Sequence, residues 1–350
     1  MNNLRSFMWM FATVLLASMM FVSCTKEGPA GLPGKDGANG KDGENGINGQ
    51  DGTATCAVCH DNSQSLFTAS RQWEASLHAT GGHFVRNNGE CAICHTSQGF
   101  LGHQNGTYDY TATGAIINNP NPPNCYTCHN IHATYTESDW ALTVNGAISM
   151  FNTTETFDFG KGSLCASCHQ GRNISNFPVV GGNPITVANT RYHMHYGTQA
   201  NIITGLGMFN IGDGLNNSLH TALIPDQCVT CHMTTAYGYE SGGHAMYLRN
   251  AAGVLNTAGC VDCHSNNTDL IASVNALQAE VSALLDELKA KLDAAGITAA
   301  GSDNTIAGTY PAVVGGAAIN YRAVKEDKSL GVHNPTYTVK LLQNTIAALP

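Results

Sequence analysis

Basic side chains are scarce in this chain. Its 350 residues contain 16 Lys and Arg against 25 Asp and Glu, which gives a formal net charge of −9 at pH 7. This balance argues against nucleic acid as a partner and against direct adsorption to an anionic membrane surface.

The loops that mark several common enzyme classes are also missing. The glycines from residue 28 to 52 keep a strict spacing of three, so they do not form a phosphate-binding loop between a strand and a helix. No serine stands on a nucleophile elbow. Few long amphipathic runs occur between residues 55 and 264, where Gly, Asn, Thr and Pro are common. This composition predicts short helices joined by irregular loops.

Six copies of Cys-x-x-Cys-His are present instead. Two thiols three residues apart can both form thioether bonds to one haem, and the next histidine can bind one axial face of its iron. Zinc knuckles, redox pairs and disulfides also use Cys-x-x-Cys, but none of them requires that histidine. We therefore predict six covalently attached c-type haems, bound through Cys56, Cys59, Cys91, Cys94, Cys125, Cys128, Cys165, Cys168, Cys228, Cys231, Cys260 and Cys263, with His60, His95, His129, His169, His232 and His264 as proximal ligands.

One of the 13 cysteines, Cys24, lies outside the motifs. It follows Arg5 and an apolar run over residues 7–22, which is short for a membrane span and typical of a secretory signal. The four residues that end at Cys24 resemble the lipobox of bacterial lipoproteins, with Phe21 in place of the commoner leucine. The resemblance implies a signal peptide over residues 1–23, export and lipidation of Cys24. A plain secreted protein is the alternative.

Residues 24–54 are predicted to hold the lipid anchor and a spacer. Glycine recurs at every third position from 28 to 52, which is the Gly-X-Y signature of collagen. Only Pro29 and Pro33 occupy the other positions as prolines, so a triple helix would be weak. An extended, solvated spacer is therefore favoured over a trimerising stalk.

Residues 55–267 form the predicted haem-binding domain. Roughly fifty residues for each motif are too few for an ordinary core around each cofactor, so packed haems are expected to supply much of the apolar interior. The predicted fold is mainly α with much irregular loop, organised around the haems, with long C-terminal helices. One earlier helix is expected over residues 65–78, with Leu66, Trp73 and Leu77 as its apolar contacts.

Residues 268–350 form a predicted helical region. Apolar residues recur at spacings of four and three, and with Gly296 as a stop they predict a long helix over 268–295. Packing of this helix on its own domain is favoured over a coiled-coil-like dimer seam. A final helix is expected to begin with Asn334 as its N-cap and Pro335 at its first position, and to pack through Leu342, Ile346 and Leu349.

The second axial ligand of each iron decides the chemistry. A second imidazole closes the iron and suits it to electron transfer, whereas an open position can bind and transform a small molecule. Nine of the 15 histidines lie outside the motifs. Methionine is the other common ligand, but five of the ten methionines lie in the leader.

The region from Cys56 onward resembles the periplasmic and surface multihaem c-type cytochromes, which are distantly akin to the pentahaem nitrite reductases and octahaem hydroxylamine oxidoreductases. The segment His195-Tyr-Gly-Thr-Gln-Ala is similar to a His-Tyr-Gly-Pro-Gln-Ala segment of that group. The resemblance implies six distal ligands: His78, His132, His195, His220, His244 and His333. His83, His103 and His193 are left over, and His193 could exchange roles with His195.

We therefore predict electron transfer through six haems in an exported, membrane-tethered cytochrome, in respiratory or extracellular electron transfer. The expected partners are a redox protein or quinone-linked donor, an unknown acceptor and the outer membrane, reached through Cys24 and facing the periplasm or the cell surface. A homo-oligomer could form through the collagen-like segment or the 268–295 helix. The alternative is a reductase or oxidase of the nitrite or hydroxylamine class at one open haem. The Cys-x-x-Cys-Lys motif that usually marks the catalytic haem of nitrite reductases does not occur.

Overall fold

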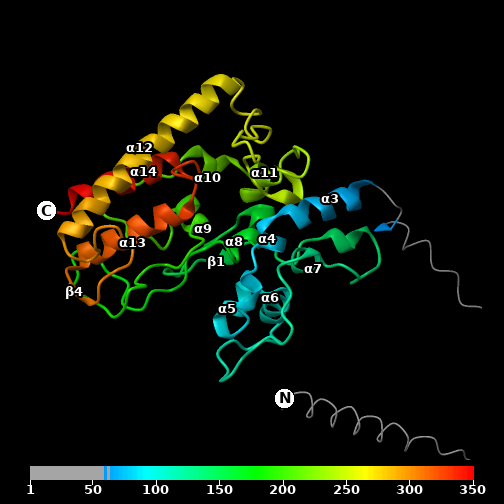
Figure 1. Cartoon of the computed structure of the whole chain (residues 1–350), viewed down its shortest axis with the longest axis horizontal. Helices are drawn as coiled ribbons and strands as arrows, with labels where there is room; N and C mark the ends of the chain where they lie inside the picture. Colours follow the sequence, from blue (N-terminus) through cyan, green and yellow to red (C-terminus); the bar gives the residue numbers. More distant parts are fainter. Residues whose placement is uncertain (1–58, 61–63) are drawn as a thin grey trace, which may run out of the picture. The chain divides into compact units, whose positions relative to one another are not determined.

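The computed structural model describes residues 59–60 and 64–350 (Figure 1). These residues belong to one compact unit, Gly52–Pro350. The signal peptide, Cys24, the collagen-like spacer and Cys56 lie outside the described residues. Within the described part, helices and loops dominate, and the strands form two two-stranded antiparallel sheets. β1 (Ile148–Ser149) pairs with β2 (Thr156–Phe157), and β3 (Ile185–Val187) pairs with β4 (Gly308–Tyr310). The prediction of a mainly α fold with much irregular loop is confirmed.

Short helices carry most of the motifs, as predicted. α5 (Gly89–His95), α7 (Cys125–Cys128), α8 (Ser163–Ala166) and α11 (Cys228–His232) each cover all or part of one motif. The motif at Cys260 is different, because it forms a single turn closed by a 2.9 Å hydrogen bond from the His264 N–H to the Cys260 carbonyl. The remaining short elements are α6 (Ser97–Gln104), α9 (Gln199–Thr204), α10 (Leu219–Leu223), η2 (His83–Val85), η3 (Glu137–Trp140), η4 (Gly160–Gly162) and η5 (Gly243–Ala245).

The helix expected over 65–78 is shorter than predicted. α3 spans Gln64–Ala75, and α4 (Leu77–Thr80) begins after a break at Ser76. The Ser76 hydroxyl donates to the Trp73 carbonyl at 2.6 Å, which is the local competition that interrupts helices at serine. The expected apolar contact of Leu77 is wrong, since this residue is 66% exposed.

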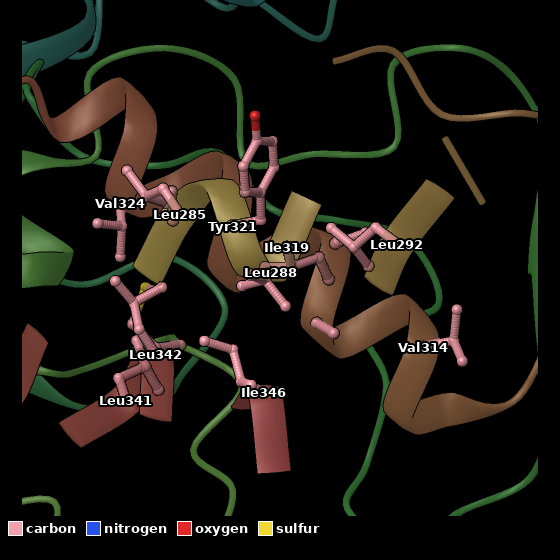
Figure 2. Close-up of a cluster of buried hydrophobic side chains, with 14 of the residues drawn as sticks. Leu285, Leu288, Leu292, Val314, Ile319, Tyr321, Val324, Leu341, Leu342 and Ile346 are labelled. Carbon is pink, nitrogen blue, oxygen red and sulfur yellow. The ribbon is translucent and has the colours of Figure 1, made fainter. Parts of the chain in front are cut away.

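The long C-terminal helix is confirmed to within one residue at each end. α12 spans Asn267–Ala294, the Asn266 side chain caps its first turn, and Gly296 follows its end with a φ of +73°. Its buried residues pack with those of α13 (Ala312–Asp327) and α14 (Pro335–Ala347) in one core, so the helix packs on its own chain (Figure 2). The side chains that meet there include Leu285, Leu288, Leu292, Ile319, Leu341, Leu342 and Ile346.

The sequence pattern does not predict α13. The helix is buried on nearly all sides, so no amphipathic stripe marks it. Two glycines sit in its middle because neighbours approach closely: a Cβ on Gly316 would lie 2.2 Å from Phe209 Cδ1, and one on Gly315 would lie 2.2 Å from Ile185 Cδ1. These glycines cost helix propensity but allow the closer packing.

α14 begins as predicted, with Asn334 at the N-cap and Pro335 in the first turn. The Asn334 side chain does not cap the helix, however. Its Nδ2 donates to the Ile202 and Ile203 carbonyls at 3.1 and 2.9 Å, which ties the start of α14 to α9. No helix among the described residues has the length and apolar content needed to cross a membrane.

Candidate haem sites

Each motif histidine lies beside the imidazole of a histidine from outside the motifs. We number the six sites by the order of their motifs. The ring centroids are separated by 6.3 Å for His60–His132 (site 1), 6.4 Å for His95–His195 (site 2), 6.3 Å for His129–His244 (site 3), 6.0 Å for His169–His78 (site 4), 6.2 Å for His232–His333 (site 5) and 6.2 Å for His264–His220 (site 6).

These separations fit one metal ion between each pair. Metal–imidazole nitrogen bonds of about 2.0 Å on opposite sides of one ion place two ring centres about 6.3 Å apart. The eleven described motif cysteines, Cys59 to Cys263, are free thiols. Among the described residues, no group of three or more His, Cys, Asp or Glu side chains is arranged to hold a metal ion. The donor set is therefore a pair of histidines with a neighbouring pair of thiols, and this fits haem c.

Helix α3 positions the two histidines of site 3. Gln72 Oε1 accepts a hydrogen bond from the backbone N–H of His244 at 3.0 Å, while Gln72 Nε2 donates to the Gly238 carbonyl at 3.1 Å. On the same helix, Trp73 Nε1 donates to the Pro123 carbonyl at 3.1 Å, just before the third motif. One helix thus holds both the loop that carries His244 and the segment that leads to His129.

Two of the proposed distal histidines have a strained backbone. His132 and His195 have φ angles of +61° and +69°, in the left-handed region that non-glycine residues seldom occupy. Such strain persists only where the surrounding structure enforces it, and it gathers at functional sites. The backbone therefore directs these two imidazoles at a cost of order 1 kcal/mol each.

Backbone carbonyls orient three of the rings. The Nδ1 of His129 contacts the Trp140 carbonyl at 2.7 Å, that of His232 the Met246 carbonyl at 2.8 Å, and that of His220 the Val332 carbonyl at 3.0 Å. A proton on Nδ1 that is bound in this way leaves Nε2 free to bind a metal.

Side chains contact three further rings. The Nδ1 of His132 lies 3.4 Å from the Tyr126 hydroxyl, and that of His78 lies 3.1 Å from the Met246 sulfur. The Nδ1 of His333 lies 2.6 Å from Asp327 Oδ1. The acceptors therefore range from a weak thioether at site 4 to a carboxylate at site 5.

Burial keeps several of these imidazoles neutral. It lowers the pKa of His169 to about 4, and burial followed by the charge of Arg172 lowers the pKa of His195 to about 4. Burial also lowers the pKa of His78 and His244. A neutral ring keeps the lone pair that metal binding needs, so these side chains can act as ligands at neutral pH.

The three histidines left over occupy different surroundings. The ring of His103 lies 5.3 Å from Tyr110, and that of His193 lies 5.5 Å from Tyr196. The ring of His83, on η2, lies 5.9 Å from the ring of His95, and the sequence did not predict this neighbour for His95. Site 2 therefore has two candidate second ligands, His83 and His195.

Comparison with known proteins gives one solved structure to set beside this fold. No protein-family model matches the sequence, and no curated protein matches it either. The crystal structure of the outer cell wall cytochrome OcwA resembles it with a TM-score of 0.50 and 22% sequence identity, over 78% of this chain and 48% of that chain.

This chain has the fold of a multihaem cytochrome. It spans about half the length of OcwA, and the likeness concerns the fold alone. The relation to the nitrite reductases and hydroxylamine oxidoreductases stays a prediction, as does the number of haems.

Proposed function

We propose that the chain is an exported, membrane-tethered electron-transfer cytochrome with six c-type haems, acting in respiratory or extracellular electron transfer. The observation that carries this proposal is the separation of 6.0–6.4 Å between each motif histidine and a second imidazole. Bound haem supplies iron that gains and loses single electrons. The chain supplies two thiols for covalent attachment and two imidazoles for the axial faces.

Closure of both axial faces favours conduction over catalysis. An iron with two histidine ligands has no position for nitrite, hydroxylamine or another small substrate. A paired histidine stands at all six sites, and site 2 offers a third imidazole in His83. The proposal therefore assigns no catalytic residue.

Contacts between motif cysteines suggest which sites are neighbours. The side chains of Cys94 and Cys168 lie close together, which puts sites 2 and 4 side by side. Cys128 and Cys168 pack against the same apolar cluster around Phe100 and Leu164, so site 3 also adjoins site 4. Attached cysteines lie at the edge of their haem, so neighbouring thiols imply neighbouring haem edges.

The same reasoning extends the order in both directions. The side chains of Cys165 and Cys228 lie close together, which joins sites 4 and 5. A Cβ on Gly259, just before Cys260, would lie 3.2 Å from Cys231 Cα, which joins sites 5 and 6. At the other end, His132 of site 1 contacts Tyr126, a residue of the third motif. The proposed path is 1–3–4–5–6, with site 2 as a branch at site 4.

Export and the tether rest on the leader and on Cys24. The name of the structural neighbour, an outer cell wall cytochrome, agrees with a protein that works outside the cytoplasm. We propose lipid anchoring of Cys24 to the outer membrane, with the glycine-rich segment as the spacer that holds the haem domain away from it.

An activity test separates the carrier from the enzyme. The purified full-length protein, reduced with dithionite and freed of excess reductant, is mixed with an oxidised soluble cytochrome c. Separate assays supply nitrite together with reduced methyl viologen as the electron donor, and hydroxylamine together with oxidised cytochrome c as the electron acceptor. We expect rapid oxidation by the cytochrome and no sustained turnover of either nitrogen compound. Steady turnover of nitrite or hydroxylamine would overturn the assignment as a carrier.

A further inference from the structure

Asp327 stands out because its carboxylate is fully buried beside a proposed axial ligand. Its side chain is 0% exposed, and Oδ1 lies 2.6 Å from Nδ1 of His333. This geometry lets the imidazole N–H donate to a carboxylate oxygen, not to a backbone carbonyl.

The cations near Asp327 are held by other carboxylates. Arg322 pairs with Glu326 at 2.9 Å and approaches Asp303 at 3.5 Å, while Lys328 pairs with Glu326 at 3.0 Å. The second oxygen of Asp327 accepts from the Ser329 hydroxyl and, at 3.3 Å, from the Ser329 N–H. The negative charge is thus stabilised by dipoles and by the ring of His333.

We infer that Asp327 tunes site 5, making its iron the hardest of the six to reduce. This inference rests on the proposed function. A carboxylate on the N–H of a ligating imidazole makes the ring a stronger donor and favours the oxidised iron, which carries one more positive charge. Reduction of a bound iron by the donor would remove that extra charge, so the Asp327 carboxylate would stabilise the reduced state less.

The other described Nδ1 contacts support the assignment to site 5. The partners at sites 3 and 6 are the neutral carbonyls of Trp140 and Val332, and the partner of His78 at site 4 is a thioether. Neutral acceptors polarise an imidazole less than a charged one does. Sites 4 and 5 are proposed neighbours, so a step in reduction potential falls between them, in the middle of the path.

The test is a potentiometric titration of the full haem-loaded protein, followed by absorbance, with Asp327→Asn as the main variant. The amide keeps the shape of the side chain and removes its charge. We expect one component, which accounts for a sixth of the absorbance change, to move to higher potential. At a fixed applied potential its ratio of oxidised to reduced iron should fall at least tenfold, which corresponds to about 59 mV for one electron. The other five components should stay in place.

Two further variants make the result specific. Glu326→Gln removes a buried charge one residue away that contacts Arg322 and Lys328, and it should leave all six components nearly unchanged. Ser329→Ala removes a donor to Asp327 Oδ2, so the carboxylate becomes a stronger acceptor for His333 and the same component should move to lower potential. Ser329→Ala keeps the proposal testable even where Asp327→Asn does not fold.

The outcomes separate this inference from the proposed function. The role of Asp327 alone would be overturned if Asp327→Asn kept six low-spin haems with unchanged potentials. An equal shift in Glu326→Gln, or the absence of a downward shift in Ser329→Ala, would overturn it as well. A wild-type protein with fewer than six haems, or with an open iron at site 5, would instead overturn the proposed function on which the inference rests.

Discussion

The imidazoles of His78 and His169 lie 6.0 Å apart, although one comes from α4 and the other from the fourth Cys-x-x-Cys-His motif. Desolvation lowers the pKa of each ring. Met246 contacts His78 through its sulfur and His232 through its carbonyl, so one residue touches proposed ligands of sites 4 and 5. The six proposed sites share this pattern: a local motif supplies one histidine, and the fold places the proposed second ligand beside it.

Removal of His78 should open one iron. In His78→Ala, site 4 keeps His169 but loses its second ligand, so we expect one haem in six to become high-spin while haem content stays the same. Electron paramagnetic resonance measures the change. The matched control is His103→Ala, whose ring faces Tyr110 and no motif histidine, and its spectrum should equal that of the wild type. An unchanged spectrum for His78→Ala would remove His78 from the ligand set.

Site 2 offers a direct choice between two histidines. We predict that His195→Ala opens this iron and that His83→Ala does not, because the strained backbone of His195 and its partly buried position indicate a fixed role, while His83 is exposed. The measurement is again the fraction of high-spin haem, with one sixth expected for His195→Ala. A high-spin signal in His83→Ala together with none in His195→Ala would reverse the assignment.

Cys24 is predicted to anchor the protein to the membrane. In Cys24→Ser the thiol that would carry the lipid is absent, so we expect the haem protein to move from the membrane fraction to the soluble exported fraction with its six haems intact. Fractionation followed by haem staining provides the measurement. Equal membrane association of the variant and the wild type would contradict lipidation at this residue.

The close approach of α13 to Phe209 predicts a loss of stability. An added methyl group in Gly316→Ala would meet the Phe209 ring at 2.2 Å, and overpacking of this kind costs about 2 kcal/mol of unfolding free energy. Denaturant unfolding of the haem-loaded protein measures the loss. Asn275→Ala, on an exposed part of α12, is the control and should change stability by less than about 0.5 kcal/mol. Equal stability of Gly316→Ala and the wild type would show that Phe209 can move aside.

The sequence predicted those features that are coded locally. The Cys-x-x-Cys-His spacing defines the proximal half of each site, and the repeated apolar positions of α12 with Gly296 at its end predicted that helix to within one residue. Ser76 shows the limit of such patterns, because its side chain interrupts a helix that periodicity alone would continue. The turn at Cys260 likewise departs from the expected motif helix.

Features that depend on tertiary contacts could not be predicted from the sequence. Similarity of short segments nominated six distal histidines, but only the fold places His244 beside His129 and His333 beside His232. The sequence did not predict α13, because the helix is buried on nearly all sides and its apolar residues do not alternate with a polar face. No sequence pattern marks Asp327 either, because its proposed role depends on its contact with His333 in the folded chain.

The central claim is that six irons are each closed by two histidines. The most direct test is low-temperature electron paramagnetic resonance of the purified, oxidised protein, calibrated against the number of haems found by intact mass. We predict six covalently attached haems and six low-spin centres, with no high-spin signal. Fewer than six attached haems, or a high-spin signal from about one haem in six, would contradict the account.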